Sequence, residues 1–146
     1  GRKIGFANKA VWRALKLDTL VWAPMYDDTV RPADDRPLSL HGLWTPKIEP
    51  EIVFTLRQAP TGTADDPAEA LAAVARIGLA YEIVDTPFAD PATQPVDFVA
   101  SGGYHVALIV GPSRPVSPDE IPDLVGRLAT FTLRLTSEAA TIDGGG

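Results

Sequence analysis

The sequence predicts an α+β protein with a β-rich core. Several short segments alternate apolar and polar residues as strands do, and only one segment is clearly helical. The chain also holds 14 Pro and 12 Gly, which interrupt long elements. Regular alternation of strands with long helices, which a doubly wound parallel sheet needs, is absent from the pattern. The 146 residues are expected to form one domain, 1–146, because domains commonly hold about 100–200 residues.

The N-terminal third predicts short elements. Asn8 is a favoured N-cap residue and precedes an amphipathic segment, so a helix is expected at Lys9–Leu15. The stretch 22–37 is rich in proline and acidic pairs, and it is expected to be largely irregular. Short strands are expected at 3–7, around 29–30 and at 38–43.

The clearest strand and the clearest helix lie in the middle of the chain. Residues 47–57 (KIEPEIVFTLR) alternate with period two and predict a strand. Residues 67–76 are Ala-rich, with Asp66 as the expected N-cap and Pro67 at the first helical position. Further strands are expected at 77–85, at 105–110, where Gly111-Pro112 ends the strand, and at 129–136, with a hairpin partner at 139–142. A helical turn is expected at 97–100, and a helix is expected to start at 117–120, where Pro122 limits its length.

Composition excludes several classes of function. The chain has no Cys, which rules out thiol nucleophiles, thiolate zinc sites, iron–sulfur clusters and disulfides. Its net charge of −6 argues against nucleic acid or an anionic membrane as a partner. No apolar run is long enough to cross a membrane, so the cytoplasm is the expected compartment.

Three glutamates form the candidate site. Glu49 and Glu51 are two residues apart on the predicted strand, so their side chains leave the same face. Pro50 between them indicates an edge strand or a bulge. Glu82 interrupts an otherwise apolar strand, where a carboxylate needs a partner. Converging carboxylates would favour a hard cation, Mg²⁺ or Mn²⁺, whereas a solvated strand face is the alternative that the spacing leaves open.

Four segments together resemble a known enzyme family. GRKIGF at 1–6, KIEPEIVF at 47–54, YEIVD at 81–85 and the segment 97–111 occur in the order seen in the 2-hydroxypenta-2,4-dienoate hydratase and 4-oxalocrotonate decarboxylase family. This family is part of the fumarylacetoacetate hydrolase superfamily, and the resemblance covers essentially the whole chain. It implies a mixed, curved β-sheet or roll of the fumarylacetoacetate hydrolase C-terminal-domain type, with few peripheral helices.

The resemblance also implies a site and a chemistry. It assigns Glu49, Glu51 and Glu82 as ligands of Mg²⁺ or Mn²⁺, and it places Lys3 in the same pocket. The implied substrate is a short 2-oxo or 2-hydroxyalkenoic acid, which chelates such a cation through its carboxylate and the adjacent oxygen. The expected activity is that of a hydratase-like lyase in aromatic-compound catabolism. Decarboxylation, acylpyruvate-type C–C hydrolysis and a non-catalytic binding or complex-forming subunit are the alternatives.

Further site residues are expected around this centre. Lys3 would neutralise an anionic oxygen or transfer a proton, and His105 is a candidate proton donor, its alternative being a local hydrogen bond. Ser101 and Gly102 are expected to contact the substrate from a glycine-rich turn. Hydratases of the family usually carry an acidic residue and an asparagine at these two positions. Asp85 is either a partner of the site or a strand-end cap.

Two expectations concern the assembly. Family members extend beyond both ends of this chain, so we expect residues 1–146 to be part of a longer protein. The partners expected are a small-molecule 2-oxo acid and further copies of the chain in a homo-oligomer, with no nucleic acid and no membrane.

Overall fold

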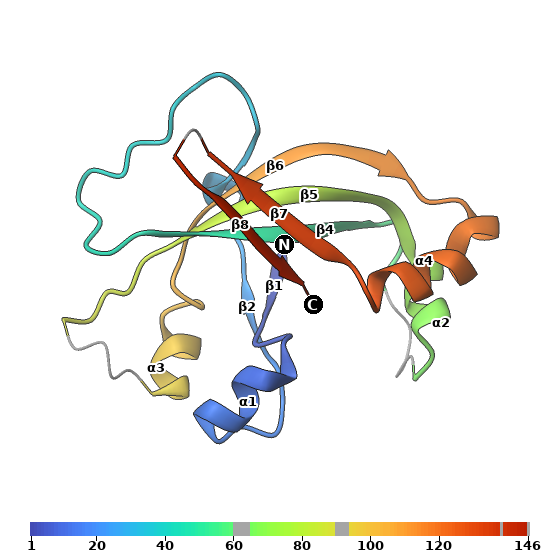
Figure 1. The fold of residues 1–146 in the computed structure, drawn as a ribbon, viewed down its shortest axis with the longest axis horizontal. Coiled ribbons are helices and arrows are strands. Elements are labelled where there is room, and N and C mark those ends of the chain that lie inside the picture. The colour runs from blue at the N-terminus through green and yellow to red at the C-terminus, as the bar shows by residue number, and fades with distance from the viewer. Residues whose placement is uncertain (60–64, 90–93, 138, 146) are drawn as a thin grey trace. The chain divides into compact units, whose positions relative to one another are not determined.

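The computed structural model describes residues 1–59, 65–89, 94–137 and 139–145 (Figure 1). None of the helices in these parts is long and apolar enough to span a membrane. The elements in chain order are β1 (Arg2–Gly5), α1 (Lys9–Leu15), β2 (Val21–Pro24), η1 (Asp27–Thr29), β3 (Val30–Pro32), β4 (Lys47–Leu56), α2 (Pro67–Ala72), β5 (Val74–Val84), α3 (Pro95–Ala100), β6 (His105–Pro115), η2 (Pro118–Glu120), α4 (Ile121–Leu128), β7 (Thr132–Thr136) and β8 (Thr141–Gly145).

The strands form a four-stranded sheet and two two-stranded sheets. The larger sheet has the order β3-β6-β5-β4, so β4 is an edge strand. In it β3 runs parallel to β6, with Val30 opposite Leu108, whereas β1–β2 and β7–β8 are antiparallel pairs. The predicted class, mixed sheets with few helices, is therefore confirmed.

The described chain divides into two compact units. The first comprises Gly1–Glu51 and Ala80–Val110, and the second comprises Ile52–Leu79 and Gly111–Gly146. Each long strand, β4, β5 and β6, therefore contributes one part to each unit. The expectation of a single domain stays a prediction.

In the first unit, local signals set the boundaries of α1. The Asn8 side chain accepts a hydrogen bond from the backbone N–H of Ala10 at 2.9 Å, as the sequence predicts for an N-cap. The helix ends at Lys16, whose left-handed conformation (φ 56°) stops the α-helical ladder. Figure 1 shows α1 at one end of the β1–β2 pair, and the bounds of this helix match the prediction.

In the second unit, a small apolar core holds two helices against strand segments. Leu71 of α2 and Leu124 of α4 pack with Val74 and Val116, and all four are buried. The two helices lie side by side in Figure 1. The Arg57 guanidinium donates to the carbonyls of Val74 at 2.7 Å and Val116 at 3.1 Å, which ties these strand ends together.

Helix α2 ends earlier than its sequence predicts. The Asp66 side chain caps it and Pro67 stands in its first turn, as expected, but the helix stops at Ala72 instead of residue 76. The Ala73 carbonyl accepts the N–H of Arg57, and β5 begins at Val74. Sheet pairing therefore overrides the helix propensity of the last four predicted residues.

The prediction of a strand at 38–43 is wrong. Residues 38–40 have no regular structure and a turn follows, closed by a 3.2 Å hydrogen bond from the Leu43 N–H to the Leu40 carbonyl. Gly42 has φ +87°, a left-handed conformation that breaks an extended segment.

Strand β6 continues past the Gly111-Pro112 stop predicted for it. It runs to Pro115, whereas β3 pairs only with residues 108–110. Proline lacks an N–H, and it is tolerated in a strand where no neighbour needs that donor.

Other boundaries shift at the C-terminal end and in the predicted irregular stretch. Strand β7 begins at Thr132 instead of 129 because α4 reaches Leu128 and the Ala129 N–H still bonds to the Val125 carbonyl. Pro122 does not limit α4, since it lies in the first turn, where no N–H is needed. Strand β2, within the stretch predicted to be irregular, forms by pairing with β1.

Candidate metal centre

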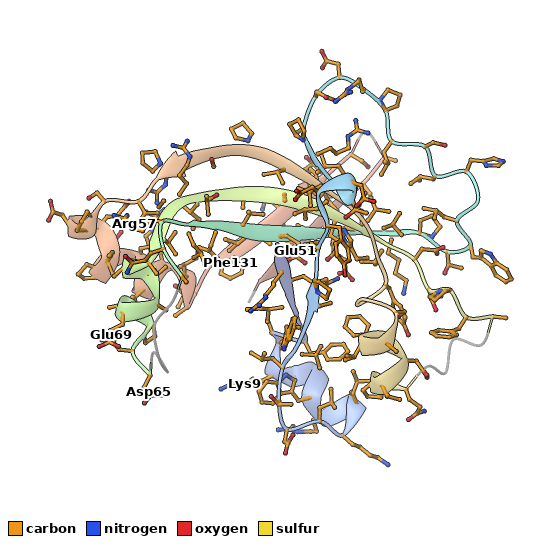
Figure 2. The ribbon with its side chains drawn as sticks, turned by 180° about the vertical axis from the view of Figure 1, so that it is seen from behind. Lys9, Glu51, Arg57, Asp65, Glu69 and Phe131 are labelled. Carbon is orange, nitrogen blue, oxygen red and sulfur yellow. The ribbon has the colours of Figure 1, made fainter. Side chains whose placement is uncertain are left out.

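Three carboxylates meet in the first unit, on two strands that are neighbours in the large sheet. Glu49 and Glu51 extend from the edge strand β4, and Glu82 extends from β5 (Figure 2 labels Glu51). One carboxylate oxygen from each lies within 4.8 Å of the other two. Pro50 fits between the two β4 glutamates because an edge strand has one side without a partner strand. The structure therefore brings together the glutamates that the sequence singled out.

The three carboxylates differ in their exposure. Glu82 is 1% exposed and is the one fully buried charged side chain among the described residues. Glu51 is half-buried, and Glu49 is exposed. The centre is thus closed on the β5 side and open toward solvent on the β4 side, as a site that admits a ligand requires.

Lys3 reaches Glu82 from β1. Its Nζ donates to Glu82 Oε1 at 2.5 Å and to the Gly103 carbonyl at 2.9 Å, with the lysine side chain 9% exposed. The ammonium also lies 5.8 Å from the centre of the Phe98 ring, within cation–π range. A lysine is rarely so buried without partners, and here the carboxylate supplies the compensating charge.

His105 contacts the same oxygen from the start of β6. Its Nδ1 is 2.8 Å from Glu82 Oε1, and its Nε2 is 2.8 Å from the Thr29 hydroxyl. The ring is only 7% exposed. Both ring nitrogens are engaged within the protein, and the predicted role of His105 as a proton donor stays a prediction.

The two β4 glutamates have raised pKa values. Burial of the Glu51 carboxyl, followed by repulsion from Glu82 and Glu49, raises its pKa to about 7. The Glu49 residue is largely exposed, but the surrounding protein partly shields its carboxyl from water; this desolvation, and then the Glu82 charge, raises the pKa of Glu49, while Lys3 and Lys47 oppose the rise. Crowded carboxylates hold protons in this way unless another cation compensates them.

Ser101 and Gly102 lie in the turn that follows α3. The Ser101 hydroxyl donates to the Asp97 carbonyl at 2.7 Å, and the backbone N–H groups of both residues bond back into α3. Gly102 has φ +69° and borders open space. Their predicted contact with a substrate stays a prediction, and these donors already have partners within the protein.

Sequence reasoning missed Thr29 and left Asp85 undecided. Thr29 lies in a stretch without a periodic pattern, and it meets His105 only because β3 pairs with β6. Asp85 accepts the N–H groups of Trp44 at 2.9 Å and Thr45 at 2.8 Å, so it caps the loop that precedes β4. His41 is exposed and lies in the turn of that loop.

The tight contact between Gly103 and Lys3 yields a first prediction. A Cβ at position 103 would lie 3.1 Å from Lys3 Cε, and φ there is +71°. Gly103→Ala is expected to destabilise the protein by about 1–3 kcal/mol, part of it from the left-handed backbone. Gly102→Ala is the matched control, because it has the same φ region and nothing within 4 Å. Equal urea midpoints for the two variants would contradict a steric effect on Lys3.

The fold and the site together define a class of protein. Mixed sheets with few helices carry a carboxylate centre suited to a hard cation, with a buried lysine and a buried histidine beside it. The structural comparison shows that this chain shares its fold with a solved 4-oxalocrotonate decarboxylase. The chain matches 4-oxalocrotonate decarboxylase from Pseudomonas putida G7, complexed with magnesium and adipate, with a TM-score of 0.72 at 23% identity, over 82% of this chain and 45% of that one.

Sequence comparison identifies particular relatives. The chain is 34% identical to 2-keto-4-pentenoate hydratase of Paraburkholderia xenovorans (strain LB400) over 119 residues, which is 81% of this chain and 43% of the relative. It is 29% identical to 4-oxalocrotonate decarboxylase of a Pseudomonas species over 111 residues, 76% of this chain and 43% of the relative. The chain thus spans less than half the length of these relatives. No family model matches it. The resemblance predicted from the sequence is confirmed.

Proposed function

We propose that Glu49, Glu51 and Glu82 hold a divalent cation, Mg²⁺ or Mn²⁺, and that the chain acts as a hydratase-like lyase on a short 2-oxo or 2-hydroxyalkenoic acid. The observation that carries this proposal is the approach of three carboxylates to within 4.8 Å. The hydratase and decarboxylase relatives support it, as does the magnesium in the solved decarboxylase.

The donor set fits a hard cation. All three groups offer carboxylate oxygens, which Mg²⁺ and Mn²⁺ prefer over softer ligands. The pKa values of Glu49 and Glu51 are raised first by burial and then by the charge of neighbouring carboxylates, and a bound cation would compensate that charge. The exposed side at Glu49 leaves room for water or substrate oxygens.

Each neighbouring residue has a proposed part. When bound, the cation would supply Lewis-acid stabilisation of negative charge on the substrate oxygens. Lys3 has three N–H donors, of which two bond to Glu82 and Gly103, so the third is available to a substrate carboxylate. Glu82 holds Lys3 in this place, and the Phe98 ring lies beside the ammonium. Substrate contacts by Ser101 and Gly102, and proton donation by His105, belong to the same proposal.

Decarboxylation is the second candidate, because one relative and the solved structure carry that name. Both reactions build negative charge next to the same pair of substrate oxygens, so one site would serve either. Hydration adds water to a 2-hydroxydienoate, whereas decarboxylation releases CO₂ from an oxalocrotonate. Product identity separates the two.

The test combines binding with product analysis. Calorimetric titration with Mg²⁺ and with Mn²⁺ is expected to show one site, and Glu49→Ala is expected to weaken it at least about tenfold through loss of a ligand. Glu69→Ala, an exposed change on α2, is the control. NMR then follows 2-hydroxypenta-2,4-dienoate, 4-oxalocrotonate and an acylpyruvate with the metal present. Unchanged binding in Glu49→Ala would overturn the centre, and binding without turnover would favour a non-catalytic subunit.

The wider setting is part of the same proposal. Residues 1–146 would belong to one catalytic domain whose sheets form a curved roll of the fumarylacetoacetate hydrolase C-terminal-domain type. The place of action would be the cytoplasm, in aromatic-compound catabolism, with the protein as a homo-oligomer. The named relatives support the reaction type and the small-molecule substrate.

A further inference from the structure

Asp85 lies directly after β5 and contacts the chain that leads into β4. Its Oδ2 accepts the backbone N–H of Trp44 at 2.9 Å, and its Oδ1 accepts that of Thr45 at 2.8 Å. All three residues belong to the first unit, as do the three glutamates of the carboxylate centre. One carboxylate therefore joins the end of the strand that carries Glu82 to the start of the strand that carries the other two glutamates.

The backbone of Asp85 is bonded on the opposite side of β5. Its N–H donates to the Tyr104 carbonyl at 2.9 Å, one residue before β6 begins at His105. Strand β5 lies between β4 and β6 in the sheet. The carboxylate thus extends toward β4 from a backbone that is already held on the β6 side.

Packing does little to hold the first part of β4. Its residues Lys47–Pro50 are all exposed, and β4 is an edge strand with one neighbour. Residues 33–46, which precede it, contain no helix or strand, and Figure 1 shows them as a long loop that leads into β4. Such loops are more mobile than the elements they connect. The position of this strand segment therefore depends on hydrogen bonds, and two of them are made to Asp85 at its entry.

A restraint at this point sets the register of β4. Successive side chains of a strand point to opposite faces, so a shift by one residue would turn Glu49 and Glu51 to the face away from Glu82. Burial of one face normally specifies the register, and the exposed residues Lys47–Pro50 do not provide it. Two oxygens that accept two consecutive N–H groups fit one register better than its neighbours. A shift in one direction would place Pro46, which has no N–H, opposite one of these oxygens.

We propose that Asp85 is a positioning residue of the carboxylate centre. Its two contacts at the entry of β4 fix the register of this strand against β5. Glu49 and Glu51 are thereby kept on the face where they meet Glu82. The consequence for cation binding rests on the proposed function, whereas the register does not.

The experiment compares Asp85→Ala, which removes both acceptor oxygens, with Asp85→Asn, which keeps one of them. Amide hydrogen exchange of the metal-free protein, followed by NMR, reports the local opening of β4. Calorimetry with Mg²⁺ and with Mn²⁺ reports the cation affinity. Asp66→Ala is the matched control, because it removes a carboxylate that also accepts a backbone N–H, that of Ala68 at 2.9 Å, but in the second unit.

In the wild-type protein and in Asp66→Ala, slow exchange is expected for the amides of the two Asp85 partners and of the two β4 glutamates. In Asp85→Ala we expect all four amides to exchange at least about tenfold faster, because two hydrogen bonds to a carboxylate are lost. The cation affinity is expected to fall at least about tenfold, as it does when other residues that hold metal ligands in place are removed. Asp85→Asn is expected to lie between the wild-type protein and Asp85→Ala in both measurements.

Unprotected amides at Trp44 and Thr45 in the wild-type protein would overturn the proposal even if the Asp85 variants fail to fold. Faster exchange confined to these two amides in a folded variant would also overturn it, because Asp85 would then cap the loop without fixing β4. An unchanged cation affinity in folded Asp85→Ala, alongside a wild-type protein that binds the cation, would do the same. If the wild-type protein binds no cation, the proposed function fails, and the exchange rates still decide the role of Asp85.

Discussion

Glu82→Gln is expected to destabilise the protein by about 3–5 kcal/mol, because it removes one partner of a buried ion pair and leaves the other uncompensated. The Lys3 side chain is 9% exposed and that of Glu82 is 2% exposed, so water does not replace the lost charge. His105 loses its anionic partner in the same change. The expected result is a lower urea midpoint, measured by circular dichroism, and a loss of cation binding in calorimetry.

A double variant tests whether the unpaired Lys3 charge causes the loss of stability. In the double variant Lys3→Met/Glu82→Gln, the unpaired ammonium is gone, so part of the lost stability is expected to return. Glu69→Gln on the exposed face of α2 is the control for the loss of one negative charge (Figure 2). If Glu82→Gln were as stable as Glu69→Gln, the ion pair with Lys3 would not be a stabilising contact.

Cation affinity is expected to rise steeply with pH around neutrality. Burial and the neighbouring carboxylates raise the pKa of Glu51 to about 7, so the cation must displace a proton below that pH. Competition by one proton lowers the affinity by up to about tenfold for each pH unit below the pKa. Calorimetric titrations with Mg²⁺ at about pH 6 and about pH 8 measure this difference.

In the metal-free protein, Glu51 gives the free energy of unfolding a pH dependence of the opposite sign. Because its folded-state pKa lies above the ordinary value of 4.5, the folded form of Glu51 binds more protons than the unfolded form between those values. Its contribution to the free energy of unfolding is therefore full below about 4.5 and is lost as the pH rises through about 7. Glu51→Gln is expected to flatten both dependences relative to Glu69→Gln. Parallel pH profiles for these two variants would refute the assignment to Glu51.

Much of the local structure could be predicted because its causes are local. Asn8 and Asp66 cap α1 and α2 as their side chains require, and alternation over residues 47–57 marks β4. Helix α2 and strand β6 depart from prediction at their C-terminal ends, where pairing between strands decides whether residues join a sheet. No window of neighbouring residues contains that information.

The candidate site shows the same difference between what local sequence determines and what strand pairing decides. The sequence by itself singled out the three glutamates and determined that Glu49 and Glu51 share one face of β4, whereas the hard cation that their oxygens favour stays a prediction. Only the tertiary structure decided that Lys3, 79 residues from Glu82, pairs with it, and that Thr29, 76 residues from His105, holds the imidazole. Such contacts depend on which strands become neighbours, and that choice is made by packing of the whole sheet rather than by the residues adjacent in the chain.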